Sequence, residues 1–286
     1  GEIEDACAYK ERFSPDIVQL GTTWTAYFAD KNALADISKY VNEYMYFEPS
    51  IKSCKILGSE KIYALPLNVD IRLLYYWKSL INNPEIELKD WESFKTTCSR
   101  IQGLITDKKA PAGMRWPIEF PVCSGEWDML HQFAIWLWGA GGEIVDVKKI
   151  CGIFPVKKAG FDNKEAVESA VFLRELITET KMPQFSLGEL ETMFIDGELG
   201  MLISGGWLAK RLQDRFGEEA WKERIGVALP PSGDYGRFTF VGGCNLAICK
   251  KAKKDGNFNY VMDLLLFLSG KEAQLIYGEA TGALPG

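Results

Sequence analysis

The chain has 286 residues, and because domains commonly hold about 100–200 residues, this length suggests two of them. Hydrophobic residues make up 47% and charged residues 25%, an ordinary globular balance that excludes a disordered or collagen-like chain. The 33 Lys and Arg are outnumbered by 39 Asp and Glu, and no basic run is dense enough to hold a phosphate backbone, so we expect no nucleic-acid partner. No apolar stretch approaches the roughly 20 residues that cross a bilayer.

Histidine and cysteine usage argues against a metal centre. His131 is the single histidine, so imidazole-based triads and zinc sites have one possible donor. The seven cysteines are scattered without a C-x-x-C pair. Cys244 and Cys249 lie five apart on a predicted strand and point to opposite faces, which fits neither a shared metal nor a mutual disulfide. We expect no metal and no cofactor, and we expect most cysteines to be small core residues.

Strand-like and helix-like segments alternate along the chain, which predicts an α/β protein built in layers. An amphipathic helix is expected over residues 2–13, before a stop signal at Ser14-Pro15-Asp16. Asp90 precedes a helix in which apolar side chains recur on one face. The later elements are expected in this order: strands at 17–20, 61–65 and 72–77, helices at 91–105, 127–138, 162–179 and 187–195, a strand at 199–204, a helix at 207–216, strands at 224–229 and 244–249, and helices at 258–268 and 271–280.

Two breaks rich in proline and glycine divide this pattern, near residues 106–121 and 230–243. Such breaks are typical of places where a chain crosses between domains. We therefore expect a discontinuous first lobe of residues 1–112 and 240–286, with residues 113–239 as the second lobe.

Both ends of the chain are interpreted as cut. A helix at residues 2–13 that leads into a strand normally follows an earlier strand of a parallel sheet, which the sequence does not contain. Residues 281–286 are expected to form a loop with nothing packed after it. The first ten residues hold no basic segment followed by an apolar one, so no signal segment is present in this chain.

Several segments, in this order, resemble one family. Phe194-x-x-Gly197, Met201 and Ser204-Gly205-Gly206-Trp207 resemble the family's most specific signature, F-x-x-G-x-x-x-M-x-x-x-G-x-W. The other matching segments are residues 15–21 followed by Trp24, Ala64-Leu65-Pro66 with Asp70-x-Arg72 and Leu74-Tyr75-Tyr76, the helix 127–142 ending in W-G-A-G-G, Leu229-Pro230, Val241-Gly242-Gly243 with Asn245-Leu246-Ala247-Ile248, and Thr281-Gly282-x-Leu284-Pro285. Together they resemble the extracellular solute-binding protein family 1, the sugar-binding subunits of ATP-driven importers.

The resemblance implies a two-lobed, periplasmic-binding-protein-like α/β fold with a ligand cleft between the lobes, here lacking its first strand and its C-terminal helices. It implies an extracytoplasmic protein, periplasmic or held at the cell surface as a lipoprotein. Such a protein captures a mono- or oligosaccharide by hinge closure and delivers it to the membrane permease of an ABC transporter. We expect a monomer that is not an enzyme.

A sugar presents an apolar face and a rim of hydroxyls, so its site combines aromatic rings with carboxylate, amide or guanidinium groups. Trp207 follows a Gly-Gly turn from which an indole can face a cleft, although a tryptophan that opens an amphipathic helix is also typical of a core. Asp70 and Arg72 lie two apart on a predicted strand and so share a face. They either reach sugar hydroxyls from the lobe opposite Trp207 or form a surface salt bridge.

Trp24 is expected in a loop after a strand, where α/β sheets place their ligands, or tucked into the core. Asn245 offers an amide to the ligand or caps its own loop. Two departures from the family pattern leave the ligand open. Leu67 and Asn68 replace a pair of aromatics, and Cys244 replaces a small polar residue.

The helix that begins near Trp127 supplies the other candidates. Trp127 and Asp128 open it, and Trp138 stands beside its glycine-rich end, as in the family. Asp128 also complements the helix dipole, which is sufficient reason for an aspartate there. Trp136 and His131 are expected in the interior.

Three alternatives to a sugar-binding protein stay open. A glycoside hydrolase would need two carboxylates across the bond, and the obvious pair, Glu126 and Asp128, diverges on a helix. A binding protein for a polyamine, an amino acid or an anion is compatible with Leu67 and Asn68. A scaffold that only mediates interactions would not need aromatics at glycine-flanked turns.

Overall fold

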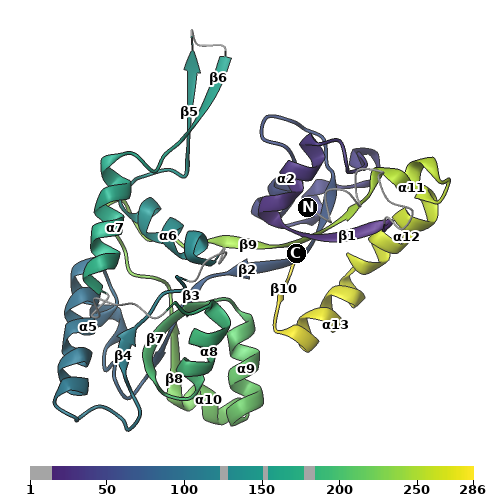
Figure 1. Ribbon diagram of the computed structural model, residues 1–286. Helices are drawn as coiled ribbons and strands as arrows, with labels where there is room; N and C mark the ends of the chain where they lie inside the picture. The colour runs from purple at the N-terminus through teal and green to yellow at the C-terminus, as the bar shows by residue number, and fades with distance from the viewer. Residues whose placement is uncertain (1–14, 123–127, 151–153, 177–183) are drawn as a thin grey trace. The chain divides into compact units, whose positions relative to one another are not determined.

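The protein is described by a computed structural model, which covers residues 15–122, 128–150, 154–176 and 184–286 (Figure 1). The described chain forms two compact units. Unit 1 comprises the chain up to Ile71 together with Val241–Gly286, and unit 2 comprises Arg72–Phe240. The expected helix at residues 2–13 lies outside the described residues, as do Cys7, Cys123, Cys151, Glu126 and Trp127.

The first unit boundary differs from the expected one. The chain leaves unit 1 after Ile71, about forty residues before the expected crossing, and returns after Phe240. The segment 106–121 belongs to unit 2, where Trp116–Ile118 forms strand β4. The expectation is wrong there because proline and glycine also shape loops inside a domain, whereas the real crossing, between Ile71 and Arg72, has no proline or glycine beside it.

The two connections between the units run beside each other. Strand β2 (Ala64–Ile71) pairs antiparallel with β9 (Val241–Ile248) up to the pair Ile71 and Val241. One residue further on, the backbone N–H of Arg72 donates to the carbonyl of Phe240 at 3.1 Å. The hydrogen-bonded ribbon therefore continues into the first and last residues of unit 2.

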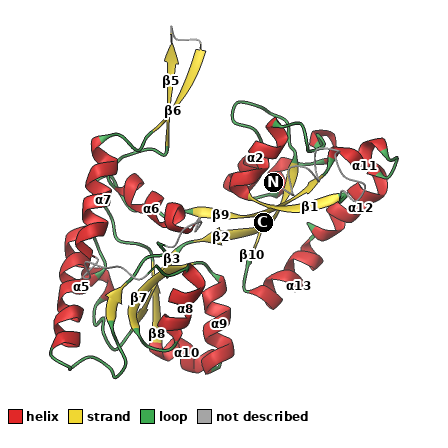
Figure 2. Ribbon diagram, in the orientation of Figure 1, coloured by secondary structure: helices red, strands yellow, loops and turns green. Residues whose placement is uncertain are grey.

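Unit 1 is built on a sheet with the strand order β1-β9-β2-β10 (Figure 2). All of its pairings are antiparallel, which differs from the parallel arrangement expected around residues 17–20. Leu284 and Pro285 pair with β2 as strand β10, where a loop was expected. The other elements of unit 1 are β1 (Ile17–Gly21), α2 (Thr22–Asp30), short 3-10 turns at Ser38–Tyr40 and Glu43–Met45, α3 (Glu48–Ser53), α11 (Lys250–Lys254), α12 (Phe258–Leu268), α13 (Lys271–Thr281) and β10 (Leu284–Pro285).

The core of unit 1 lies between its sheet and its helices. Strand residues Leu65 and Ile248 are fully buried there, together with Leu265 of α12. Phe28 of α2 and Ile51 of α3 complete the packing. Each element thus contributes the apolar side of its sequence pattern to one shared core.

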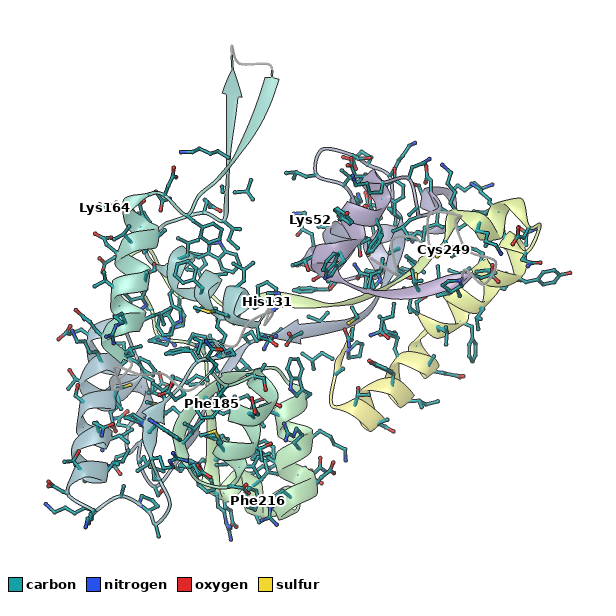
Figure 3. All side chains as sticks on the ribbon, viewed as in Figure 1. Lys52, His131, Lys164, Phe185, Phe216 and Cys249 are labelled. Atoms are coloured by element: carbon teal, nitrogen blue, oxygen red, sulfur yellow. The ribbon has the colours of Figure 1, made fainter. Side chains whose placement is uncertain are left out.

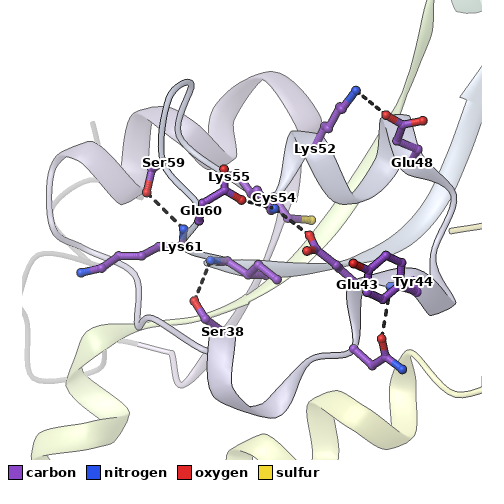
Figure 4. A network of polar contacts seen from close by, with 12 residues as sticks. Ser38, Glu43, Tyr44, Glu48, Lys52, Cys54, Lys55, Ser59, Glu60 and Lys61 are labelled. Atoms are coloured by element: carbon purple, nitrogen blue, oxygen red, sulfur yellow. Dashed lines mark hydrogen bonds and ion pairs between the residues drawn. The ribbon is translucent and has the colours of Figure 1, made fainter.

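The mostly enclosed Lys55 links parts of the irregular segment of unit 1 through ion pairs (Figure 4). The Lys55 Nζ donates to Glu43 at 2.6 Å and to Glu60 at 3.3 Å. The Glu43 hydrogen bond raises the pKa of Lys55. Nearby, the backbone N–H of Ile62 donates to the Ser38 hydroxyl at 2.9 Å. These contacts join separate parts of the segment 38–62 to one another.

Unit 2 is a sheet covered on both faces, with the strand order β4-β7-β3-β8. Because strand side chains alternate between faces, Leu74 and Tyr76 enter one core while Tyr75 enters the other. Helices α5, α6 and α7 cover the first face, and α8 and α9 cover the second (Figure 1). The remaining bounds in unit 2 are β3 (Leu73–Trp77), α4 (Pro84–Glu87), α5 (Trp91–Thr106), α6 (Asp128–Gly139), β5 (Val145–Ile150), β6 (Phe154–Ala159), α7 (Lys164–Leu176), α8 (Leu187–Ile195), β7 (Leu199–Ser204), α9 (Trp207–Phe216), α10 (Glu218–Arg224) and β8 (Ile225–Ala228).

Helix ends in unit 2 follow the signals in the sequence. The Asp90 carboxylate accepts from the backbone N–H of Ser93 at 2.9 Å and caps α5, as expected. Asn163 caps α7 in the same way through the N–H of Ala166. Gly141, just past α6, takes a φ of +85°, which favours glycine, as the Gly-Ala-Gly-Gly run predicts.

Three cysteines of the described chain, Cys54, Cys98 and Cys249, are confirmed as core residues, whereas Cys244 is half-buried. Cys54 and Cys98 are buried, and burial raises the pKa of each thiol to about 12. Both therefore stay protonated at neutral pH and act as small apolar groups. Over the described ranges, neither a cluster of metal-ligating side chains nor a helix with the length and apolar character needed to cross a membrane is found.

We expect Trp136→Ala to lower the free energy of unfolding by about 3–5 kcal/mol. The Trp136 ring is fully buried and packs against the rings of Trp91, Phe94 and Phe172. Chemical denaturation followed by circular dichroism measures the loss. The matched control is Trp138→Ala, two residues along on the same helix and half-buried, which should cost less. Equal losses in both variants would contradict this assignment.

Candidate functional site

Trp207 stands at the turn between a strand and a helix of unit 2. Strand β7 ends at Ser204, and α9 begins at Trp207 after Gly205 and Gly206. A Cβ atom at Gly205 would lie 2.2 Å from Cζ3 of the indole. Glycine is therefore required for the half-buried ring to lie against the backbone of the turn.

Arg72 lies over this indole. Its guanidinium carbon is 4.9 Å from the centre of the Trp207 ring, a cation–π distance. Arg72 is 2% exposed, and its Nη2 donates to the Asp128 carboxylate. Because a buried cation is costly without a counter-charge, Asp128 is the group that makes this position possible for arginine.

Asp128 opens helix α6 and connects Arg72 to the one histidine of the chain. Its carboxylate lies 3.5 Å from Nδ1 of His131, one turn further along the helix. The His131 ring, labelled in Figure 3, is in unit 2. It stacks on Phe240, with ring centres 4.1 Å apart and planes 14° from parallel. His131 is mostly enclosed, as expected, but it borders the polar group at Asp128 and does not lie in a purely apolar interior.

Glu191 of α8 completes the group and was not anticipated from the sequence. It is 4% exposed, and its carboxylate accepts from the indole Nε1 of Trp207 at 2.6 Å. The Ser204 hydroxyl and Arg211 also donate to it. Arg72, Asp128, His131, Glu191 and Trp207 are called the Trp207 cluster below. It combines an aromatic ring with carboxylate and guanidinium groups, as a polyhydroxy ligand requires.

Unit 1 carries an exposed aromatic pair on helix α2. Trp24 and Tyr27 are 38% and 40% exposed, and their rings meet edge to face with centres 6.0 Å apart. Trp24 lies in the first turn of α2, which follows β1 without a loop, so the expected loop position is wrong. Tyr27 lies three residues further along the same helix face, which is the spacing that could have revealed it.

Asp70 and Arg72 do not share a strand. Asp70 belongs to β2 in unit 1, opposite Gly242 of β9, whereas Arg72 follows the end of that strand and belongs to unit 2. Arg72 therefore lies in the same unit as Trp207, not in the opposite lobe. The expectation that Asp70 and Arg72 share a face assumed one continuous strand. The strand ends at Ile71, and the extended sequence pattern gives no sign of that end.

Asn245 is a core residue, which corrects its expected role as a ligand group. It is fully buried on β9, and its Nδ2 donates to the hydroxyls of Thr25 and Ser53, each at 3.0 Å. These bonds tie α2 and α3 to the sheet and leave the side chain inside unit 1.

The remaining sequence candidates have different outcomes. Trp138 is half-buried in the last turn of α6, and Trp127 lies outside the described residues. Leu67 is buried, and the Asn68 Oδ1 accepts from the N–H of Cys244 at 2.6 Å. Leu67 and Asn68, which replace two aromatics of the family pattern, therefore make contacts within the protein.

Two α/β units joined by adjacent connections, with aromatic and polar groups on each, define the two-lobed fold of a solute-binding protein. The chain belongs to the bacterial extracellular solute-binding protein family, whose model matches residues 9–286. The family consists of binding proteins, which agrees with the resemblance seen in the sequence.

Solved structures of sugar-binding proteins share the fold. The GacH receptor of Streptomyces glaucescens, solved without ligand and with acarbose, superimposes with a TM-score of 0.75 at 21% identity over 99% of this chain and 68% of its own. Maltose-bound MalE3 of T. maritima gives 0.71 at 22% identity over 95% and 66%. An ABC transporter solute-binding protein of Thermotoga lettingae with bound α-D-tagatose gives 0.74 at 20% identity over 99% and 69%.

A curated relative adds a match in sequence. The galactooligosaccharide-binding protein of Bacillus subtilis is 25% identical over 170 residues, which are 57% of this chain. The matched segment spans only about a third of that relative, 36% of its length.

We expect Asn245→Ala to lower the free energy of unfolding by about 1–3 kcal/mol, because it leaves the hydroxyls of the buried Thr25 and the half-buried Ser53 without their amide donor. Thermal and urea unfolding measure the change. Asn42→Ala is the control, since the exposed Asn42 side chain accepts one bond from the N–H of Tyr44 and its loss should cost less than about 1 kcal/mol. A stable Asn245→Ala protein with weakened ligand binding would restore the ligand role.

Proposed function

We propose that this protein binds a mono- or oligosaccharide, with Trp207 as the aromatic wall of the site on unit 2. The observation that carries the proposal is the placement of the half-buried indole beside the paired Arg72 and Asp128. An indole face covers the C–H face of a sugar, while a guanidinium donates hydrogen bonds to its hydroxyls and a carboxylate accepts hydrogen bonds from them.

Further support comes from unit 1 and from the relatives. Trp24 and Tyr27 offer a second, more exposed aromatic surface. Proteins of the same fold are described with acarbose, maltose and tagatose, and the relative from B. subtilis with galactooligosaccharides. Asp70 and Trp138 stay in the proposal as candidate ligand residues, as does Trp127.

The proposal extends to transport. The protein would act outside the cytoplasm as a monomer, periplasmic or anchored as a lipoprotein, close its two lobes on the sugar and deliver it to an ABC transporter permease. It would bind without catalysis. A hydrolase acid must face the glycosidic oxygen, whereas Asp128 and Glu191 already face Arg72 and Arg211.

A panel of maltose, acarbose, tagatose and galactooligosaccharides tests the ligand class. We expect at least one of them to raise the melting temperature and to bind in calorimetric titration, because binding to the folded state alone stabilises it. Incubation of the same sugars with the protein, followed by reducing-end detection, should show no hydrolysis. Binding of a polyamine, an amino acid or an anion instead of any sugar would reject the carbohydrate proposal.

Trp207→Ala should weaken binding of whichever sugar of this panel binds the unmodified protein by about 2 kcal/mol or more, because a buried aromatic anchor carries a large share of binding energy. Trp91→Ala is the matched control. Trp91 also opens a helix and is half-buried, but it stacks on Phe172 at 4.5 Å within the α5–α7 core. The control should lose stability and keep its affinity. An unchanged affinity of Trp207→Ala would remove Trp207 from the site.

A further inference from the structure

The hydrogen bonds around the buried Glu191 carboxylate restrict the orientation of the Trp207 side chain. Among the described residues, three donors reach it: the Ser204 hydroxyl, the Trp207 indole N–H and the Arg211 guanidinium. Ser204 and Trp207 both donate to the same oxygen, Oε1, while Arg211 donates to Oε2. A carboxylate this enclosed is tolerated because both of its oxygens are bonded and one cation pairs with it.

The geometry around Trp207 holds the indole at both ends. Its N–H edge is bonded to Glu191 at 2.6 Å, and its six-membered ring lies against the backbone of Gly205, where a Cβ would come within 2.2 Å. The Arg72 guanidinium lies over the ring. A tryptophan side chain has two rotatable bonds, so a fixed N–H direction together with a closed approach at the opposite edge leaves the ring little freedom.

We propose that Glu191 is a positioning residue for ligand binding: it holds the Trp207 indole in the orientation that receives the ligand before the ligand arrives. The inference rests on the proposed function, in which Trp207 is the wall of a sugar site. A side chain that is already ordered loses less conformational freedom on binding, so the contact with the ligand yields more affinity. Glu191 is bonded at the N–H edge of the ring and is buried, so it is not itself a ligand group.

A purely structural role makes a different prediction. Glu191 also joins α8 to α9 through Arg211, a salt bridge with one buried partner. If that link were its whole purpose, removing the carboxylate would destabilise unit 2 to the same extent whatever residue stands at position 207. The positioning role requires the indole N–H, and a double-mutant cycle distinguishes the two roles.

The experiment combines Glu191→Met, which keeps an unbranched side chain of similar length and removes both acceptor oxygens, with Trp207→Phe, which keeps a ring and removes the N–H donor. For the sugar that binds the unmodified protein, we expect Glu191→Met alone to weaken affinity about tenfold, as for the loss of a hydrogen bond to a charged group. In the Trp207→Phe background the same change should alter affinity less than about twofold. Equal losses in both backgrounds would overturn the proposal.

Arg211→Gln is the control for the link between the helices. It removes the cation that pairs with Glu191 and leaves the Trp207 hydrogen bond in place. We expect it to lower the melting temperature and to change affinity less than about twofold. A tenfold loss of affinity here, equal to that of Glu191→Met, would also count against positioning.

A ligand-free measurement separates failure of this inference from failure of the proposed function. The chain has nine tryptophans, so its indole N–H groups give few resonances in a ¹⁵N-labelled sample, and the Trp207 resonance is the one lost in Trp207→Phe. Glu191→Met, which leaves no acceptor oxygen for the indole N–H, should shift or broaden that resonance and leave those of distant tryptophans in place. An unmoved Trp207 resonance would overturn the positioning role. If none of the sugars binds, the proposed function fails and this resonance alone decides whether Glu191 orients the ring.

Discussion

The buried guanidinium of Arg72 is the group on which the arrangement of the candidate site in unit 2 depends. Arginine stays charged at every physiological pH, so its burial next to the unit boundary requires a fixed anion and a face to lie on. Asp128 supplies the anion from the start of α6, and Trp207 supplies the face from the start of α9. One cation thereby brings together elements that are far apart in the sequence.

The pairing of Arg72 with Asp128 also limits the kind of ligand that the Trp207 cluster accepts. Arg72 and Asp128 neutralise each other, and Glu191 is neutralised by Arg211. A charged ligand such as a polyamine would compete for one member of a pair and leave the other without its partner in an enclosed site, which is costly. A neutral polyhydroxy ligand can hydrogen-bond to the outer edges of the pair and leave it intact. The charge pattern therefore favours a sugar over the non-sugar solutes that Leu67 and Asn68 left open.

The sequence predicted most elements of regular periodicity, and its failures have physical causes. The helices at 91–106, 187–195 and 207–216 follow from apolar stripes, caps and glycine turns. Short helices α10 and α11 carry little apolar surface and were missed. The crossing after Ile71 has no composition signal because the hydrogen-bonded ribbon continues through it. Such a boundary is set by which side chains pack together, and that is a tertiary property.

The site was only partly visible for a related reason. Trp207 could be found because its glycine turn is local, whereas the other members of the Trp207 cluster come from α6, from α8 and from the link between β2 and β3. Glu191 did leave a signal, since it occupies the i+4 place of an apolar stripe formed by Leu187, Leu190 and Phe194. A charged residue on the buried face of a helix needs a partner inside the protein, and this inference was available from the sequence alone.

Each unit has a buried polar side chain that hydrogen-bonds close to an aromatic surface, but one bond restrains a helix and the other restrains a single ring. In unit 1, Asn245 bonds to Thr25, which lies between the exposed Trp24 and Tyr27 on α2. That helix is also held by its own apolar face, including the buried Phe28, so the amide is one restraint among several. In unit 2, Glu191 bonds directly to the ring of Trp207, which also lies against the backbone of Gly205 and beneath the Arg72 guanidinium. Loss of Asn245 is therefore expected to lower stability, whereas loss of Glu191 is expected to change the orientation of one indole in addition to removing the link to Arg211.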